Sequence, residues 1–348
     1  GKTNLLKSIA FLRWFIADSF SDLEPTSKIT SSHYFQSFIF CQNPGPSTFE
    51  VVFGLSDGIY KYNLEITSEK VLSETLEVKK ESNRWSSVFS RICDIDSGEY
   101  TNNFSKLGLP SDFEKLVRGN SSVLSSAKQI NNPEAVKIVN YFTKIQSSFD
   151  EMDAPDKNAF KALYKVAEFY HNNPEILVKA EKILQRFDLG ISKLTVVPYK
   201  RTDNTEVHVP FASHKNIDSD VETTLLLNQE SGGTRNLFLL LKDILAALET
   251  GDTVVFDELD NNLHPLMVPE IVNLFRSKNH NPKNAQLFFS THNVQILSEL
   301  DKQQIVIVEK DEKNISDAWK LDKVEGVRSD ENYYTKYLAG VYGGIPKF

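Results

Sequence analysis

Two short apolar runs, each followed at once by polar residues, place the strongest constraint on how this chain folds. Residues 253–256 lead into the acids Asp257 and Glu258, and residues 287–289 lead into the Ser-Thr-His of residues 290–292. Such short runs of strand-forming residues are typical of buried strands in a parallel sheet. Ligands of open α/β sheets gather at the carboxyl ends of the strands, so the sequence predicts a site there.

A glycine-rich turn precedes the first of these strands. Ser231, Gly232 and Gly233 stand before residues 236–250, whose apolar side chains recur on one helical face, and Gly251 is a suitable end for that helix. Free N–H groups at the start of a helix bind anions. A plain serine cap with a glycine turn fits the same residues, and both interpretations stay open here.

The chain opens with Gly1, Lys2 and Thr3, which match the end of a G-x-x-x-x-G-K-[ST] phosphate-binding loop. In such a loop the lysine reaches the terminal phosphates and the hydroxyl ligates Mg²⁺. The first glycine and the strand that delivers it are expected upstream of residue 1. A helix is expected next, because apolar residues recur at helical spacing: Leu5, Ile9, Leu12 and Ile16.

The polar residues at the two strand ends suit the chemistry of a bound nucleotide. Asp257 is suited to hold Mg²⁺ through water, because hard cations prefer oxygen ligands. Glu258 is placed to orient or deprotonate an attacking water, and His292 to hydrogen-bond a terminal phosphate. Considered alone, Asp257 and Glu258 could be solvated acids where a strand meets a loop, and His292 could be a structural histidine. Because polar residues end two similar strands in the same way, the functional interpretation is favoured.

The complete set of motifs resembles the ATP-binding-cassette ATPases of the SMC and recombination-repair kind. More narrowly, it is similar to the AAA-type ATPases of bacterial abortive-infection and phage-defence systems, which are RloA- and AbiL-like and related to OLD-family ATPase heads. The resemblance rests on G-K-T-N-L-L, S-G-G-T-R, V-V-F-D-E-L-D-N-N-L-H-P, S-T-H-N and the closing residues 337–346. It implies an α/β fold: a P-loop ABC-type ATPase head with a parallel core sheet, an antiparallel β-subdomain and a compact helical insertion.

By position, the resemblance assigns roles to individual residues. ATP binding is assigned to Gly1, Lys2, Thr3 and Asn4, and to Ser231, Gly232 and Gly233, which would contact the γ-phosphate held by a second protomer. Catalysis is assigned to Glu258 and His292, and Mg²⁺ binding to Thr3, Asp257 and the Q-loop glutamine. Gln129 is the preferred glutamine and Gln42 the second candidate, with an ordinary surface role as the open alternative for either.

Two positions depart from the family pattern. The D-loop, residues 259–264 by resemblance, ends in Leu263-His264, whereas many cassette ATPases end it in Leu-Asp. The cross-dimer contacts of that aspartate are therefore not carried over. Thr234 stands where transporters have glutamine, which agrees better with the soluble relatives.

Three segments are expected along the chain. Residues 1–100 would form the first part of the head, with an antiparallel meander near residues 49–78 that turns at Asp57-Gly58. Residues 101–190 would form the helical insertion, with helices over 135–149, 160–167 and 174–189 closed by Gly190, either as a docking surface or as a lid that completes the core. Residues 191–348 would complete the head, with strands at 194–197, 207–211, 223–227 and 305–308 and a helix from His292 to Leu300.

Composition limits the functional classes. The net charge of −8 argues against a protein that coats DNA. One basic group is interrupted by acids and is interpreted as a solvated edge rather than a nucleic-acid contact: Lys193, Lys200, Arg201, His208, His214 and Lys215. Two cysteines make neither a disulfide framework nor a zinc site. No apolar run approaches the about 20 residues that span a bilayer, and no secretory signal is seen. A cytoplasmic protein without a membrane partner is therefore expected.

The sequence therefore predicts an ATPase that uses ATP and Mg²⁺ and forms a homodimer through composite ATP sites, with higher homo-oligomers left open. By resemblance it would be the regulatory ATPase of an anti-phage system that controls a separate effector, a nuclease or a Toprim-type enzyme. The alternative is a repair or recombination ATPase that acts directly on DNA, for which long heptad arms or a basic groove would argue; neither is evident. A nucleotide-binding scaffold with little hydrolysis is the third alternative, which Glu258 and His292 disfavour.

Overall fold

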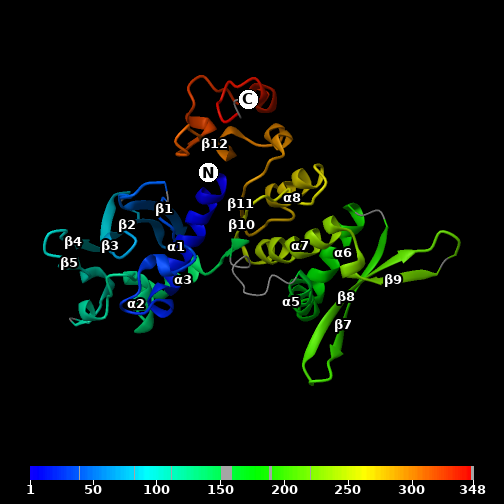
Figure 1. Ribbon diagram of the computed structural model, residues 1–348, viewed down its shortest axis with the longest axis horizontal. Helices are drawn as coiled ribbons and strands as arrows, with labels where there is room; N and C mark the ends of the chain where they lie inside the picture. The colour runs from blue at the N-terminus through cyan, green and yellow to red at the C-terminus, as the bar shows by residue number, and fades with distance from the viewer. Residues whose placement is uncertain are drawn as a thin grey trace. The chain divides into compact units, whose positions relative to one another are not determined.

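The computed structural model describes residues 1–38, 40–81, 83–110, 112–149, 159–187, 190–219 and 221–345 (Figure 1). The chain divides into two compact units. The larger unit consists of Gly1–Leu6 and Gln146–Phe348, and the smaller unit of Lys7–Ile145. Helix α1 (Lys2–Asp22) starts in the larger unit and continues in the smaller one, and it confirms the helix expected at the start of the chain.

An antiparallel meander forms the sheet of the smaller unit, in the strand order β1-β2-β3-β4-β5. Strand pairing joins Leu55 to Gly58, so Ser56 and Asp57 make a two-residue turn one position earlier than expected. Alternate residues of the second strand are buried because one face of the sheet packs on the core. The meander was predicted through its third strand and continues for two more. The strands are β1 (Ser47–Leu55), β2 (Gly58–Ile66), β3 (Val71–Lys79), β4 (Trp85–Cys93) and β5 (Tyr100–Asn103).

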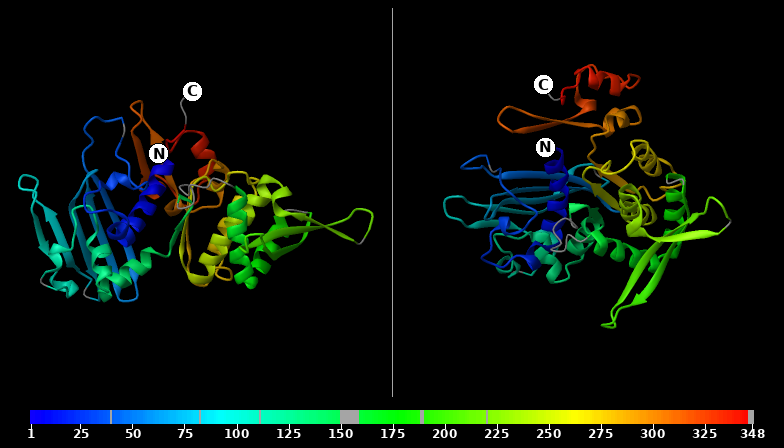
Figure 2. Two further views of the ribbon diagram at one scale, coloured as in Figure 1. Left: turned by 60° about the horizontal axis from the view of Figure 1, so that its bottom comes forward. Right: turned by 45° about the vertical axis from the view of Figure 1, so that its right-hand side comes forward.

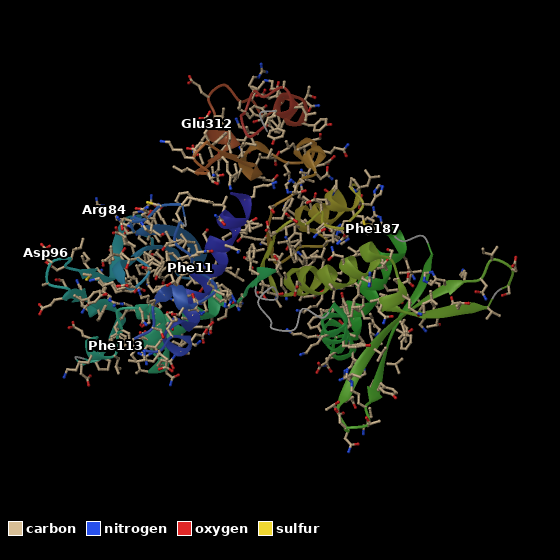
Figure 3. All side chains as sticks on the ribbon, viewed as in Figure 1. Phe11, Arg84, Asp96, Phe113, Phe187 and Glu312 are labelled. Carbon is tan, nitrogen blue, oxygen red and sulfur yellow. The ribbon has the colours of Figure 1, made fainter. Side chains whose placement is uncertain are left out.

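A buried carboxylate joins this sheet to the start of helix α2 (Val123–Gln129), and helix α3 (Pro133–Phe142) follows in the same unit. Glu74 accepts hydrogen bonds from the Tyr62 hydroxyl at 2.9 Å, the Ser122 hydroxyl at 2.7 Å and the Val123 N–H. The Arg91 guanidinium lies 3.8 Å from it, and both side chains are inaccessible to solvent. Phe11 and Phe113 are buried in this unit as well (Figure 3).

The core sheet of the larger unit has the strand order β11-β10-β6. Strands β10 (Thr253–Phe256) and β11 (Gln286–Phe289) are parallel, as the two apolar runs predicted. The expected burial holds for β10 and is wrong for β11, which stands at the end of the strand order and exposes Phe288. The helix expected over 135–149 ends at Phe142, because Ile145 starts the strand β6 (Ile145–Ser147) beside β10. The helices of this unit are α5 (Ala159–Asn172), α6 (Pro174–Phe187), α7 (Gly232–Thr250) and α8 (Met267–Arg276).

One hydrophobic core unites these helices with the core sheet, and side chains from α5, α6, α7, α8 and β10 all belong to it. Gly251 ends α7 with φ +83°, as expected of a glycine cap. Leu189, the expected end of α6, lies outside the described residues. Helices α5 and α6 thus belong to the larger unit and α2 and α3 to the smaller, so the three expected segments do not coincide with the two units.

A separate antiparallel sheet, in the order β7-β8-β9, projects from the larger unit (Figure 2). Its strands, β7 (Ile191–Lys200), β8 (Glu206–Lys215) and β9 (Glu222–Leu226), confirm the three strands predicted there. His208 is buried, with its ring 4.3 Å from that of His171, and the His214 ring nitrogen lies 2.7 Å from Glu230. These two histidines therefore make internal contacts, whereas Lys193, Lys200, Arg201 and Lys215 are exposed.

After β11 one expectation is wrong and one is confirmed. The segment that follows His292 forms a short 3₁₀ helix instead of the helix expected through Leu300. The strand expected at 305–308 is confirmed as β12 (Val306–Lys310), which pairs with β13 (Ser316–Lys320). The closing motif packs on this hairpin: the Gly344 N–H donates to Glu309 at 3.0 Å. Pro346 lies outside the described residues. The last helix is α9 (Tyr333–Leu338), and the 3₁₀ helices are η1 (Ile29–Ser31), η2 (Ser105–Leu107), η3 (Phe113–Lys115), η4 (Leu227–Gln229), η5 (Val294–Ser298), η6 (Lys302–Gln304) and η7 (Leu321–Lys323).

Candidate functional site

The carboxyl ends of β10 and β11 are joined through Ser290. Its hydroxyl donates to Asp257 Oδ1 at 2.5 Å and accepts a hydrogen bond from the Glu258 N–H at 2.8 Å. The Ser290 carbonyl accepts from the Leu259 N–H at 2.9 Å. Because Ser290 is buried, water competes little for these bonds, and one side chain fixes the positions of both acids.

Glu258 has an unusual backbone conformation. Its φ is +49°, in the left-handed region that residues with a Cβ adopt at a cost. Its carboxylate is about half exposed and lies 3.8 Å from Nε2 of His292. Backbone strain of this kind persists where the surrounding structure holds it, and it is concentrated at functional sites. The structure therefore holds an accessible carboxylate beside an accessible imidazole.

Asp260 holds the backbone of His292. Both of its carboxylate oxygens accept from the His292 N–H, at 3.1 and 3.2 Å. The Asn261 N–H donates to the Glu258 carbonyl at 2.8 Å and closes a tight turn. The loop that carries Glu258 is thus tied directly to the end of β11.

Lys2 lies against the same strand end. Its Nζ donates to the Thr291 carbonyl at 3.0 Å and lies 3.3 Å from Nδ1 of His292. Lys2 begins α1, so Thr3 and Asn4 fall in its first turn, where free N–H groups and the helix dipole favour an anion.

Ser231 caps helix α7. Its Oγ accepts from the Thr234 N–H at 3.1 Å, which is the serine-cap alternative considered above. Apart from its chain neighbours and the backbone of its own helix, no atom of the described residues lies within 4 Å of where a Cβ on Gly232 would be. A Cβ on Gly233 would lie 2.9 Å from the Asn262 carbonyl oxygen. The open side of Gly232 leaves the start of α7 accessible.

Gln129 belongs to the smaller unit, unlike Thr3 and Asp257. Its amide donates to the Ser21 hydroxyl at 3.2 Å and to the Ser125 carbonyl at 3.4 Å. In the larger unit Asp257 contacts Ser148 as well as Ser290: the Ser148 hydroxyl accepts from the Asp257 N–H at 3.1 Å. The sequence prediction missed Ser148, which follows β6 directly, because a helix was expected over these residues.

The donor set fits Mg²⁺ bound together with a nucleotide. Among the described residues no group of three or more His, Cys, Asp or Glu side chains could hold a metal ion. Mg²⁺ is commonly held by one or two carboxylates, waters and phosphate oxygens rather than by an all-protein cage. Asp257, with the Thr3 hydroxyl in the first turn of α1, supplies oxygen donors of this kind.

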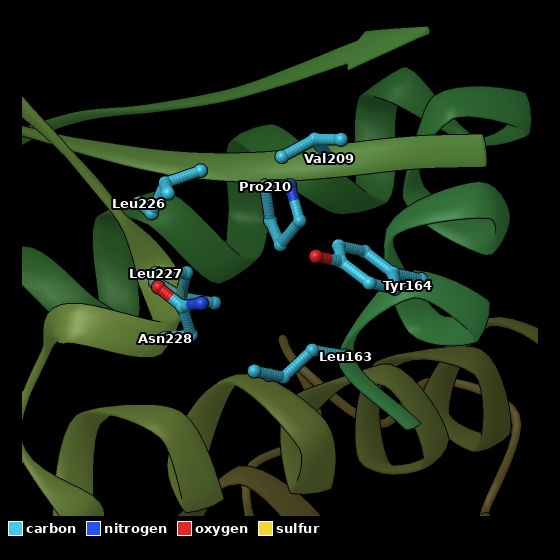
Figure 4. Close-up of a pocket in the computed structure, with 7 residues that line it drawn as sticks. All are labelled: Leu163, Tyr164, Val209, Pro210, Leu226, Leu227 and Asn228. Atoms are coloured by element: carbon cyan, nitrogen blue, oxygen red, sulfur yellow. The ribbon is translucent and has the colours of Figure 1, made fainter. Parts of the chain in front are cut away.

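A small apolar pocket between α5 and β8 contains none of the motif residues (Figure 4).

Comparisons with known proteins bear on this site. The family model "AAA domain, putative AbiEii toxin, Type IV TA system" matches residues 1–298. No curated protein matches the chain. None of the described helices is long and apolar enough to span a membrane.

Solved structures of SMC heads are similar at low identity. An Smc head bound to the C-winged helix domain of ScpA has 12% identity and a TM-score of 0.44, covering 94% of this chain and 90% of its own. An Smc head with an extended coiled coil, bound to the C-terminal domain of ScpA derived from Pyrococcus furiosus, has 12% identity and a TM-score of 0.38, covering 98% and 90%.

A third structure comes from work on ATP-driven dimerization and DNA-stimulated activation of SMC ATPases. It has 16% identity and a TM-score of 0.35, covering 51% of this chain and 96% of its own. The family match spans most of the chain and includes Lys2, Asp257, Glu258 and His292. The chain therefore belongs to the AAA-domain family of ATPases described as the putative AbiEii toxin of a type IV toxin–antitoxin system.

Proposed function

We propose that this chain hydrolyses ATP at the carboxyl ends of β10 and β11. Lys2 and the first turn of α1 hold the phosphates, and Asp257 and Thr3 are the Mg²⁺ ligands. Glu258 orients or deprotonates the attacking water, and His292 responds to the terminal phosphate. The observation that carries this proposal is Glu258 itself: a strained, accessible carboxylate fixed by Ser290 and placed 3.8 Å from His292.

The site is proposed to be composite. The start of α7 carries Ser231 and an open Gly232 and offers N–H groups to an anion. The phosphate-binding Lys2 belongs to α1 instead, and its amine contacts Thr291 after β11. Two copies arranged head to tail would place the Ser231 end of one chain on the nucleotide held by Lys2 of the other. This ATP-sandwich homodimer would then close when the γ-phosphate is bound and open after the γ-phosphate is lost.

The biological role is proposed to be that of a regulatory ATPase in an anti-phage system of the RloA- or AbiL-like kind, controlling an effector in trans. The family description, which names a putative toxin and a type IV toxin–antitoxin system, supports a defence role. The separate effector, a nuclease or a Toprim-type enzyme, is proposed from the resemblance to the abortive-infection ATPases. A repair ATPase acting directly on DNA is the alternative; the net charge of −8 disfavours it.

Replacement of Glu258 by glutamine tests the hydrolytic role. Glu258→Gln is expected to lower steady-state ATP turnover by roughly 10²–10⁴-fold, because that is the usual contribution of a general base. The variant should retain nucleotide and show stronger ATP-dependent dimerisation by light scattering. Glu175→Gln, an exposed acid at the start of α6, is the matched control and should match the wild type. Wild-type turnover in Glu258→Gln would refute the assignment.

The site of toxicity can be tested separately. The purified full-length protein, given ATP and Mg²⁺, is expected not to cleave DNA or RNA, because the effector is proposed to be another protein. Robust cleavage that is abolished by a mutation within this chain would place the effector here instead. That result would leave the ATPase assignment intact and overturn only the regulatory role.

A further inference from the structure

The loop that carries Glu258 is anchored on more than one side. We define the acid loop as residues 258–263. Its N-terminal end is tied to Ser290, and its Asp260 carboxylate binds the His292 N–H. Both of these anchors lie at the end of β11, so they fix the acid loop relative to the core sheet.

Helix α7 supplies another anchor. Asn236, in its second turn, donates from Nδ2 to the Asn261 carbonyl at 2.7 Å. One turn earlier, a Cβ on Gly233 would lie 2.9 Å from the Asn262 carbonyl oxygen, a separation that side chains do not tolerate. The start of α7 therefore touches the acid loop at two consecutive peptide groups, once through a hydrogen bond and once through backbone-to-backbone packing.

We infer that Asn236 is a positioning residue that couples the Ser231 end of α7 to Glu258 within one chain. This inference rests on the proposed function, in which Ser231 serves the partner's nucleotide and Glu258 the chain's own. Contact of Ser231 with the partner's γ-phosphate would move or stiffen the start of α7, and Asn236 would pass that change to the acid loop. One composite site would thereby influence the geometry of the other.

The physical basis is the strained backbone of Glu258. Because its φ of +49° is unfavourable, the acid loop keeps this conformation only while its anchors hold. Loss of the Asn261 anchor frees the C-terminal side of the turn. Helix α7 itself should be little affected, since buried apolar residues from Leu237 to Leu248 hold it in the core.

Asn236→Ala and Asn236→Asp test the coupling, the second because it keeps the side-chain shape but cannot donate a hydrogen bond to Asn261. Both are expected to lower kcat by about three- to tenfold, the usual net effect of one hydrogen bond, with KM unchanged within about twofold. In the Glu258→Gln background they should leave ATP-dependent dimerisation unchanged. Asn273→Ala, at an exposed site on α8, is the control and should change none of these quantities.

Hydrogen exchange provides a readout that does not depend on hydrolysis. In Asn236→Ala the amides of the acid loop, above all that of Asn261, should exchange several-fold faster while the core of α7 does not change. If the wild type lacks ATPase activity and acid-loop exchange still accelerates, the proposed function fails and the link between α7 and the acid loop stands. If the wild type hydrolyses ATP and both kcat and acid-loop exchange are unchanged in Asn236→Ala, the inference is overturned.

Discussion

Glycine at position 258 is expected to stabilise the protein relative to alanine, the reverse of the usual order. The backbone of Glu258 has φ +49° and its side chain is about half exposed, so burial contributes little to the comparison. The left-handed conformation costs a residue with a Cβ about 1–2 kcal/mol. The extra freedom of glycine in the unfolded chain costs about 0.5–1 kcal/mol. Subtraction leaves Glu258→Gly more stable than Glu258→Ala by about 0–1.5 kcal/mol.

The same pair of substitutions at Asn273 is the matched control, because this exposed residue lies inside α8. There Asn273→Gly should be less stable than Asn273→Ala by about 0.8–1 kcal/mol. Urea unfolding of the four variants measures both differences, and melting temperatures should follow at about 2–4 °C per kcal/mol for a domain of about 200 residues. If the glycine variant is less stable than the alanine variant at position 258 by as much as at position 273, the backbone of Glu258 is not strained.

Two further predictions concern buried polar groups. Ser290→Ala should lower kcat at least tenfold and reduce the free energy of unfolding in urea by about 1–3 kcal/mol, because Asp257 and the Glu258 N–H lose their shared partner. Unchanged turnover would show that Ser290 does not position Glu258. Burial raises the pKa of Glu74, against the opposing effect of Arg91. A raised folded-state pKa gives stability that is present below the unfolded-state value of about 4.3 and is lost as pH rises. The unfolding free energy of the wild type minus that of Glu74→Gln should therefore fall above that pH, and a difference that grows would contradict the assignment.

The elements that the sequence predicted correctly have strong local signals. Residues 236–250 carry a helical apolar stripe with a glycine at the end, and the two short apolar runs form β10 and β11. The first two strands of the meander alternate apolar and polar residues, which reflects one buried face, and the third alternates in burial from Glu74 onward. In these segments local propensity and burial favour the same structure.

The elements that were missed depend on tertiary contacts. Strand β4 places Arg91 in the core, where Glu74 and two backbone carbonyls satisfy it, so its apolar alternation is broken. Strand β6 has only three residues and follows a helical stripe that continued in phase through Ile145. Ser148 and Asn236 belong to no motif, and their contacts with Asp257 and Asn261 come only from the fold.

Mixing two inactive variants tests the central claim most directly. In the full-length protein, Lys2→Ala disables the phosphate-binding end of a chain and Ser231→Arg disables the end that serves the partner. A heterodimer of the two contains one site in which both ends are intact, provided that the sites are composite. Each heterodimer should therefore regain up to about half of the wild-type ATPase rate per dimer, although each variant alone is inactive. A mixture that stays inactive while heterodimers are demonstrably present would contradict the shared-site account.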